Sequence, residues 1–297
     1  MKTHVALGTE RRRALDAWPI GTICLAAGIL AASGQAGPGP SGAAGADLRG
    51  GRNLIATPVY SEAEDQRILG LFRGLRVSDA IDGMDAVGLP STGLMDPGIR
   101  PLWRDTEKFT HRIIGIAVTA RYVPTQQPAA GARAIEDYDR WAGEWYRNRS
   151  SEPFTALIRP GTALVIEDAP DADVGSIGSN NILGWKVRGC VGVVTSATAR
   201  DTDEIIAEKV PLYYRQPGRG IRPGRNEIES VNRPIVCGGM LVMPGDVIVA
   251  DGDGVLVVPR AKAEAVAAYA RKILDGDKEG RRQLYKKLGM PSDDSVR

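Results

Sequence analysis

The sequence predicts an α/β domain in which short helices cover sheets of apolar strands. Long runs of apolar, β-branched residues, such as 112–123 and 191–196, indicate sheets that are covered on both faces. Strands and short helices alternate along residues 162–214. The stretch "PGTALVIED" at 160–168 returns as "PGDVIVADG" at 244–252, which indicates two similar β-units within one β-rich domain.

Helices are predicted at the start of this domain. Residues 61–75 open with the capping-box pattern of Ser61 and Glu64 and continue with apolar residues at helical spacing. Residues 77–84 predict a second, shorter helix.

Beyond these helices, both strands and helices are expected along the rest of the domain. Residues 137–149 are helical or looped; they place Trp141 and Trp145 on one face, where packing is favoured over binding. The other expected elements are strands at 112–123, 162–168, 191–196 and 210–214, helices at 180–189 and 201–208, three short strands within 234–242 and 246–259, and a terminal amphipathic helix at 261–277.

Composition and charge narrow the class of function. The chain has 297 residues, of which 43% are hydrophobic and 25% charged, as in ordinary globular proteins. The formal net charge of +2 falls within residues 1–33, so the remaining chain holds 34 basic and 34 acidic residues. Such a balance argues against a nucleic-acid partner. The arginine-rich stretch 213–225 is interpreted as a solvated loop, with an anionic partner as the alternative.

The chain is expected to have three parts. Residues 1–33 resemble a targeting segment: a basic stretch precedes an apolar run at 20–33, and small residues follow at its end. The run is shorter than the ~20 residues that span a membrane, so no stable membrane insertion is expected. Residues 34–57 are a flexible spacer and 58–297 a single domain. We expect export to the periplasm or medium after cleavage; the alternative is a cytoplasmic protein with a non-functional extension.

The cysteines and histidines exclude several kinds of site. Cys24 lies in the targeting segment, whereas Cys190 and Cys237 sit beside apolar residues and are interpreted as small buried hydrophobes, with a disulfide as the alternative. No CxxC motif is present, which argues against zinc. His4 and His111 are the only histidines, too few for a multi-histidine metal site.

One constellation could carry chemistry. A loop rich in Gly, Ser and Asn, residues 171–183, leads into a helix whose free N–H groups would bind an anion. The strand that follows leads to Arg200, whose guanidinium can bind a carboxylate through two N–H groups, and to Asp201, whose carboxylate oxygens can bind Mg²⁺ or Mn²⁺. Together they would hold a small keto acid on a metal that acts as a Lewis acid. The alternative is structural: Asp201 and Glu204 have capping-box spacing, and Arg200 alone is typical of a surface ion pair.

Other candidate residues have structural interpretations that are favoured. Lys186 could form a Schiff base but is expected to reach solvent from a helix. Glu167 and Asp168 could support the site, although a turn is favoured. Asp251 and Asp253 suggest a calcium loop, yet its twelve-residue pattern is missing and a hairpin turn is preferred.

Four separated motifs resemble the RraA-like family, which contains 4-hydroxy-4-methyl-2-oxoglutarate aldolases and the regulator of ribonuclease E activity. The motifs are "VSDAIDGMDAVGLPSTGLMDPGIRPL", "GIAVTARYVP", "GCVGVVTSATARD" and "RPIVCGGMLVMPGDVIVADGDGVLVVP", within about residues 60–275. The resemblance implies a three-layer β/β/α swivelling domain with N-terminal helices and a C-terminal helix. It also implies a homotrimer or hexamer with active sites between subunits.

The resemblance also implies roles for particular residues. The aldolases use a divalent metal, Mg²⁺ or Mn²⁺, to release pyruvate by retro-aldol cleavage, and they decarboxylate oxaloacetate. The family's Arg-Asp pair maps to Arg200, which would bind the keto-acid substrate, and Asp201, which would hold the metal. The family's glycine-rich loop, whose backbone amides hold the substrate carboxylate, maps to Gly178, Ser179, Asn180 and Asn181. The aldolases usually carry an acidic residue where this chain has Ser179.

Three functions are therefore compared. The first is a metal-dependent pyruvate aldolase or oxaloacetate decarboxylase. The second is a non-catalytic binding protein of the ribonuclease-inhibitor type, against which the retained Arg200-Asp201 pair argues. The third is a lyase or hydratase for another hydroxy-keto acid, for which the long insertion at 125–158 leaves room.

Overall fold

A computed structural model describes residues 53–128, 131–169 and 173–297. The predicted targeting segment, 1–33, and residues 34–52 of the expected spacer lie outside this part of the chain. None of the helices within the described ranges is both long enough and apolar enough to cross a membrane.

The centre of the fold is one mixed sheet in the order β1-β6-β4-β3-β2-β11-β12, with β8 also paired to β2. Strands β2, β3, β4 and β6 run parallel to one another, and the outer pairings are antiparallel. The bounds are β1 (Arg100–Pro101), β2 (Ile113–Pro124), β3 (Thr162–Glu167), β4 (Cys190–Thr195), β6 (Leu212–Tyr214), β8 (Asn226–Val231), β11 (Val247–Asp251) and β12 (Gly254–Val258).

A small antiparallel pair, β9 (Ile235–Cys237) and β10 (Met240–Val242), packs on one face of this sheet. The turn between them holds Gly238 and Gly239 at φ +56° and +79°, a region that favours glycine. This turn divides 234–242 into two strands, so the expected three strands in 234–259 are wrong in number: the structure has four.

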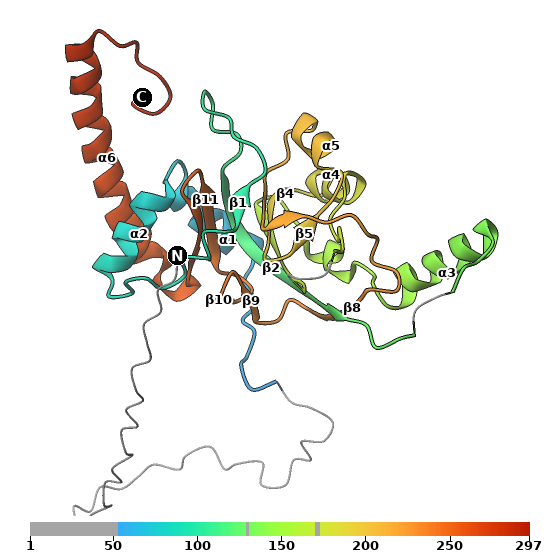
Figure 1. Ribbon diagram of the computed structural model, residues 1–297. Coiled ribbons are helices and arrows are strands. Elements are labelled where there is room, and N and C mark those ends of the chain that lie inside the picture. Colours follow the sequence, from blue (N-terminus) through green and yellow to red (C-terminus); the bar gives the residue numbers. More distant parts are fainter. Residues whose placement is uncertain (1–52, 129–130, 170–172) are drawn as a thin grey trace, which may run out of the picture. The chain divides into compact units, whose positions relative to one another are not determined.

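The first and last helices cover the β11–β12 end of the sheet (Figure 1). They are α1 (Glu62–Phe72), α2 (Val77–Ala86) and α6 (Ala263–Leu288), and their apolar faces share a core with β11 and β12. The predicted capping box of Ser61 and Glu64 is confirmed. Helix α2 lies so close to α6 that a Cβ on Gly83 would stand 2.5 Å from the Val266 carbonyl oxygen.

A second group of helices covers the parallel strands. Helices α4 (Ser179–Val187) and α5 (Thr202–Ala207), with a 3-10 turn at Pro153–Leu157, bury Ile182, Trp185, Ile205 and Phe154 against the sheet. The stretch expected to be helical or looped is helix α3 (Ile135–Asn148). The predicted α/β class, with helices at the N-terminal end of the domain and one at the C-terminus, is confirmed.

Several local interpretations are also confirmed. Cys190 and Cys237 are buried and unbridged, and burial raises the pKa of Cys190 to about 11 and that of Cys237 to about 12. Asp251 ends β11 in a hairpin turn, where its side chain accepts the Asp253 backbone N–H at 2.9 Å. Lys186 is exposed and donates to the Glu208 carbonyl oxygen at 3.2 Å.

The pH dependence of stability tests the burial of His111. Its Nδ1 accepts the Asp105 backbone N–H at 3.1 Å, and the residue is only 4% exposed. Burial, and after it the nearby Arg112 cation, lowers the pKa of His111 below its ordinary value of 6.5. The unfolded chain therefore binds a proton first, so stability is full above pH ~6.5 and falls as pH drops from there toward the folded-state pKa.

We expect the free energy of unfolding, measured with urea, to decrease as the pH falls from ~7.5 to ~5.5, the range in which the unfolded histidine gains its proton. The variant His111→Gln keeps an acceptor for the Asp105 N–H but has no proton to bind, so it should lose most of this slope. Equal slopes in the two proteins would show that His111 is not the titrating group.

Candidate functional site

The site lies where a glycine-rich loop meets the strand that carries Arg200. In this loop, Ile177 pairs with Ala199 of the short strand β5 (Thr198–Ala199), and the Arg200 N–H donates to the Ile177 carbonyl oxygen at 2.8 Å. Gly178 then forms the N-cap of α4. Tertiary hydrogen bonds therefore place the start of α4 beside Arg200.

Asp201 joins these two segments. It adopts a left-handed backbone, φ 56° and ψ 40°, which is uncommon for a residue other than glycine. Its Oδ2 accepts the Ser179 N–H at 3.1 Å, and its Oδ1 lies 3.6 Å from Nε of Arg200. Both side chains are 37% exposed, so they remain open to solvent and to a ligand.

The capping-box alternative for Asp201 is wrong in its main feature. Asp201 does occupy the N-cap position of α5, but its side chain makes no cap hydrogen bond to that helix. The carboxylate instead bonds to the first residue of α4, Ser179. The left-handed backbone turns the side chain from its own helix toward the neighbouring one.

Two glycines make room for the Arg-Asp pair. A Cβ on Gly178 would stand 2.7 Å from Oδ2 of Asp201, and a Cβ on Gly175 would stand 2.6 Å from Cβ of Arg200. Real Cβ atoms essentially never approach so closely. The loop therefore needs glycine at both positions for Arg200 and Asp201 to hold this arrangement.

The structure brings the predicted loop residues together with Arg200 and Asp201 but gives them different environments. Asn180 is exposed at the first turn of α4, where N–H groups have no partner within the helix. The Ser179 N–H is already bonded to Asp201, and the Asn181 side chain points inward, where Nδ2 donates to Oε1 of Glu152 at 2.6 Å. Their role in binding a substrate carboxylate stays a prediction.

Glu152 and Arg222 support α4 from within the fold, and neither was identified from the sequence. Glu152 accepts hydrogen bonds from the Asn181 side chain and from Nε1 of Trp185, the latter at 2.9 Å. It also forms an ion pair with Arg222, whose side chain is 4% exposed and donates to the Tyr122 hydroxyl at 2.8 Å. No sequence motif marks these residues, because they meet only through the fold.

Asp168 supports the loop from the other side. It accepts hydrogen bonds from the Asn226 side chain at 2.7 Å, from the Ser176 hydroxyl and from the Ala169 N–H at 2.8 Å. Burial raises its pKa, while these donors oppose the shift. Asp168 thus anchors the loop that leads to α4, which is the supporting role that the sequence favours less than a turn.

The chemistry of the donors fits a divalent cation at Asp201. Among the residues that the structure describes, no group of three or more His, Cys, Asp or Glu side chains could hold a metal. Mg²⁺ needs no such group, since it keeps several waters and usually takes one or two protein carboxylates. Asp201 offers one half-exposed carboxylate in the space that Gly178 leaves free.

Several known proteins are similar to this chain in sequence. A family model described as RraA-like, Aldolase/RraA, matches residues 76–257. A Halalkalibacterium halodurans protein provisionally named 4-hydroxy-4-methyl-2-oxoglutarate aldolase is 36% identical over 38% of this chain and 53% of its own length. A Thermus thermophilus protein named 4-hydroxy-4-methyl-2-oxoglutarate aldolase is 29% identical over 33% of this chain and 60% of its own length. The chain spans about half the length of the curated relatives it matches.

Solved structures share the fold. A protein from Pseudomonas syringae pv. tomato str. DC3000 matches with a TM-score of 0.58 at 24% identity, covering 80% of this chain and 97% of that one. Streptomyces coelicolor RraAS2, described as an unusual member of the RNase ES inhibitor RraA family, matches with a TM-score of 0.57 at 21% identity, covering 76% and 98%. At these identities the likeness shows the fold alone.

Proposed function

Because the chain belongs to the RraA-like family, we propose that it is a divalent-metal-dependent lyase that cleaves 4-hydroxy-2-oxo acids to release pyruvate. The proposed substrates include 4-hydroxy-4-methyl-2-oxoglutarate, the compound in the names of three of its relatives, and oxaloacetate, which would lose CO₂. The observation that carries the proposal is the half-exposed pair of Arg200 and Asp201 at the start of α4.

In this proposal each residue of the site has a separate role in binding. Arg200 binds the C1 carboxylate of the substrate through its guanidinium fork. The first backbone N–H groups of α4, at Asn180 and Asn181, add hydrogen bonds to the same carboxylate. Asp201, held by the Ser179 N–H, is the protein ligand of Mg²⁺ or Mn²⁺. A bound divalent ion supplies Lewis-acid polarisation of the 2-oxo group.

Pyruvate detection tests the proposal. Oxaloacetate, 4-hydroxy-4-methyl-2-oxoglutarate and other 4-hydroxy-2-oxo acids are each supplied to the protein with Mg²⁺ or Mn²⁺, and pyruvate is followed with lactate dehydrogenase. We expect release from at least one compound, lost on addition of EDTA and restored by excess metal. Release that stays above the protein-free rate in EDTA would exclude metal-dependent chemistry, and no release above that rate from any compound would favour a non-catalytic regulatory role.

The glycine at the start of α4 provides a second test. In Gly178→Ala the new Cβ would displace the Asp201 carboxylate, and we expect pyruvate release to fall about 10–100-fold, as small displacements in active sites do. Gly184→Ala is the matched control: it lies in the same helix, and its Cβ would meet nothing within 4 Å. Equal activities of the two variants would contradict the proposed site.

A further inference from the structure

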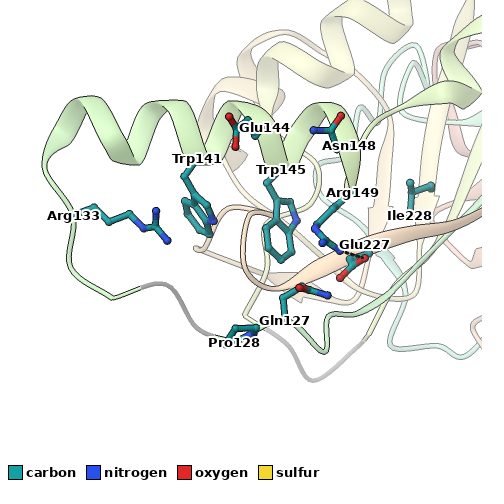
Figure 2. A pocket seen from close by; sticks show the side chains of 10 residues that line it. All are labelled: Gln127, Pro128, Arg133, Trp141, Glu144, Trp145, Asn148, Arg149, Glu227 and Ile228. Atoms are coloured by element: carbon teal, nitrogen blue, oxygen red, sulfur yellow. Dashed lines mark hydrogen bonds and ion pairs between the residues drawn. The ribbon is translucent and has the colours of Figure 1, made fainter.

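A cavity of about 660 Å³ lies between α3, β8 and the segment that follows β2 (Figure 2). None of its lining residues belongs to the loop 178–181 or to the Arg200-Asp201 pair. Its volume falls within the ~300–1,000 Å³ typical of small-molecule sites. The cavity is thus a separate feature of this chain, independent of the proposed lyase activity.

Two indole rings form one wall of this cavity. Trp141 and Trp145 lie one turn apart on α3, with ring centroids 5.8 Å apart and planes inclined by 57°. Trp145 is 6% exposed, and its Nε1 donates to the Asn226 carbonyl oxygen at 3.0 Å, so packing explains it. Trp141 is half-buried, and its edge lies over Gly224, where a Cβ would stand 3.3 Å from the ring. Its indole is therefore fixed in place yet still borders the cavity.

The polar groups of the lining are balanced in charge. Arg133 and Arg149 lie over the rings of Trp141 and Trp145, at 5.3 and 5.4 Å from the ring centroids. Arg149 is paired with Glu227 at 3.2 Å. The lining also includes Glu144, so its two cations and two anions cancel. A phosphate or other anion would therefore gain no net attraction here.

We propose that this cavity binds a neutral oligosaccharide. A sugar ring has an apolar face of C–H groups and a rim of hydroxyls that both donate and accept hydrogen bonds. The exposed part of the Trp141 indole, beside Arg133 on the ring, would contact that face. The amides of Gln127 and Asn148, the carboxylates and the guanidinium groups match the rim. An uncharged, polyhydroxylated ligand can hydrogen-bond to these side chains without adding a net charge to the lining.

Titration calorimetry and ligand-observed NMR on the full chain test this inference, with cellohexaose, xylohexaose and maltohexaose as probes. We expect at least one to bind with a submillimolar Kd and Trp141→Ala to weaken it at least tenfold. Gln127→Ala, a change at an exposed residue, should weaken it several-fold. Tyr269→Ala is the control, because it removes a half-exposed aromatic ring from α6. Pyruvate release should be the same in all of these variants.

Three outcomes would overturn the inference. The first is that wild-type protein binds none of the probes. The second is that Trp141→Ala and Gln127→Ala both bind as tightly as wild type. The third is that AMP binds more tightly than every saccharide and loses affinity in Arg133→Ala, which would make the cavity a nucleotide site. These binding measurements do not depend on lyase activity, so they would stand even if the proposed function were wrong.

Discussion

Asp201→Asn is expected to lower pyruvate release by more than about 100-fold. Replacing residues that merely support metal ligands already costs about 10–100-fold, and Asp201 is the proposed ligand itself. The amide oxygen of Asn can still accept the Ser179 N–H, so the junction between α4 and the Arg200 segment should persist. What is lost is the negative charge. Steady-state kinetics on both proteins at saturating Mg²⁺ measure the effect.

The control for this prediction is Asp203→Asn. Asp203 is an exposed acidic residue in the first turn of α5, two positions along the chain, and makes no contact with α4 that the proposal uses. It should keep wild-type activity and wild-type Mn²⁺ affinity, whereas Asp201→Asn should bind Mn²⁺ at least tenfold more weakly by electron paramagnetic resonance. Wild-type Mn²⁺ binding in Asp201→Asn would remove this residue from the metal site.

Arg222→Met is expected to lower the free energy of unfolding by about 3–5 kcal/mol, the largest change in stability predicted for this chain. Removing one partner of a buried ion pair leaves the other charge without compensation. Here the group left unpaired would be Glu152, which also accepts hydrogen bonds from Asn181 and Trp185 of α4. The Arg222 side chain has a relative exposure of 4%, so water cannot replace it without a local rearrangement. Urea unfolding measures the change in free energy.

Arg219→Met is the matched control for this prediction. Arg219 pairs with Asp173 at 2.8 Å, but its side chain is 87% exposed, so solvent screens this pair and its loss should change stability little. The double variant Arg222→Met, Glu152→Gln should be less destabilised than Arg222→Met plus the separate cost of Glu152→Gln, since no unpaired charge remains. If Arg222→Met were as stable as Arg219→Met, the buried pair would not support α4.

Features that depend on neighbouring residues were predictable from the sequence. The capping box at Ser61 and Glu64 is a contact across three residues, and the buried strand at 162–168 needs only its apolar pattern. Strand β8 (Asn226–Val231) was missed, because it follows an arginine-rich stretch interpreted as a loop and pairs with β2, far away in the chain. The side chains of β8 are mostly only partly buried, and its sequence, NEIESV, lacks the run of apolar residues by which the buried strands were predicted.

In the candidate site, too, some features were predictable from the sequence and others depend on contacts between distant residues. The proximity of Arg200, Asp201 and the loop 178–181 was predicted from family motifs, and the structure places them together. Local spacing suggested that Asp201 caps its own helix, but a hydrogen bond to Ser179, 22 residues earlier, replaces that cap. Glu152 was missed because its bond to Asn181 spans 29 residues. Such bonds leave no periodic pattern in a sequence.

The most direct test of the metal-dependent lyase is a single comparison of initial rates. Wild-type protein is freed of metal with EDTA, dialysed, and assayed for pyruvate release from oxaloacetate and from 4-hydroxy-4-methyl-2-oxoglutarate before and after addition of Mg²⁺. After the rate without protein is subtracted, we predict that metal-free protein is inactive, that Mg²⁺ restores pyruvate release, and that Asp201→Asn stays inactive under the same conditions. Equal rates with and without Mg²⁺, or full restoration of Asp201→Asn, would contradict the metal-dependent mechanism.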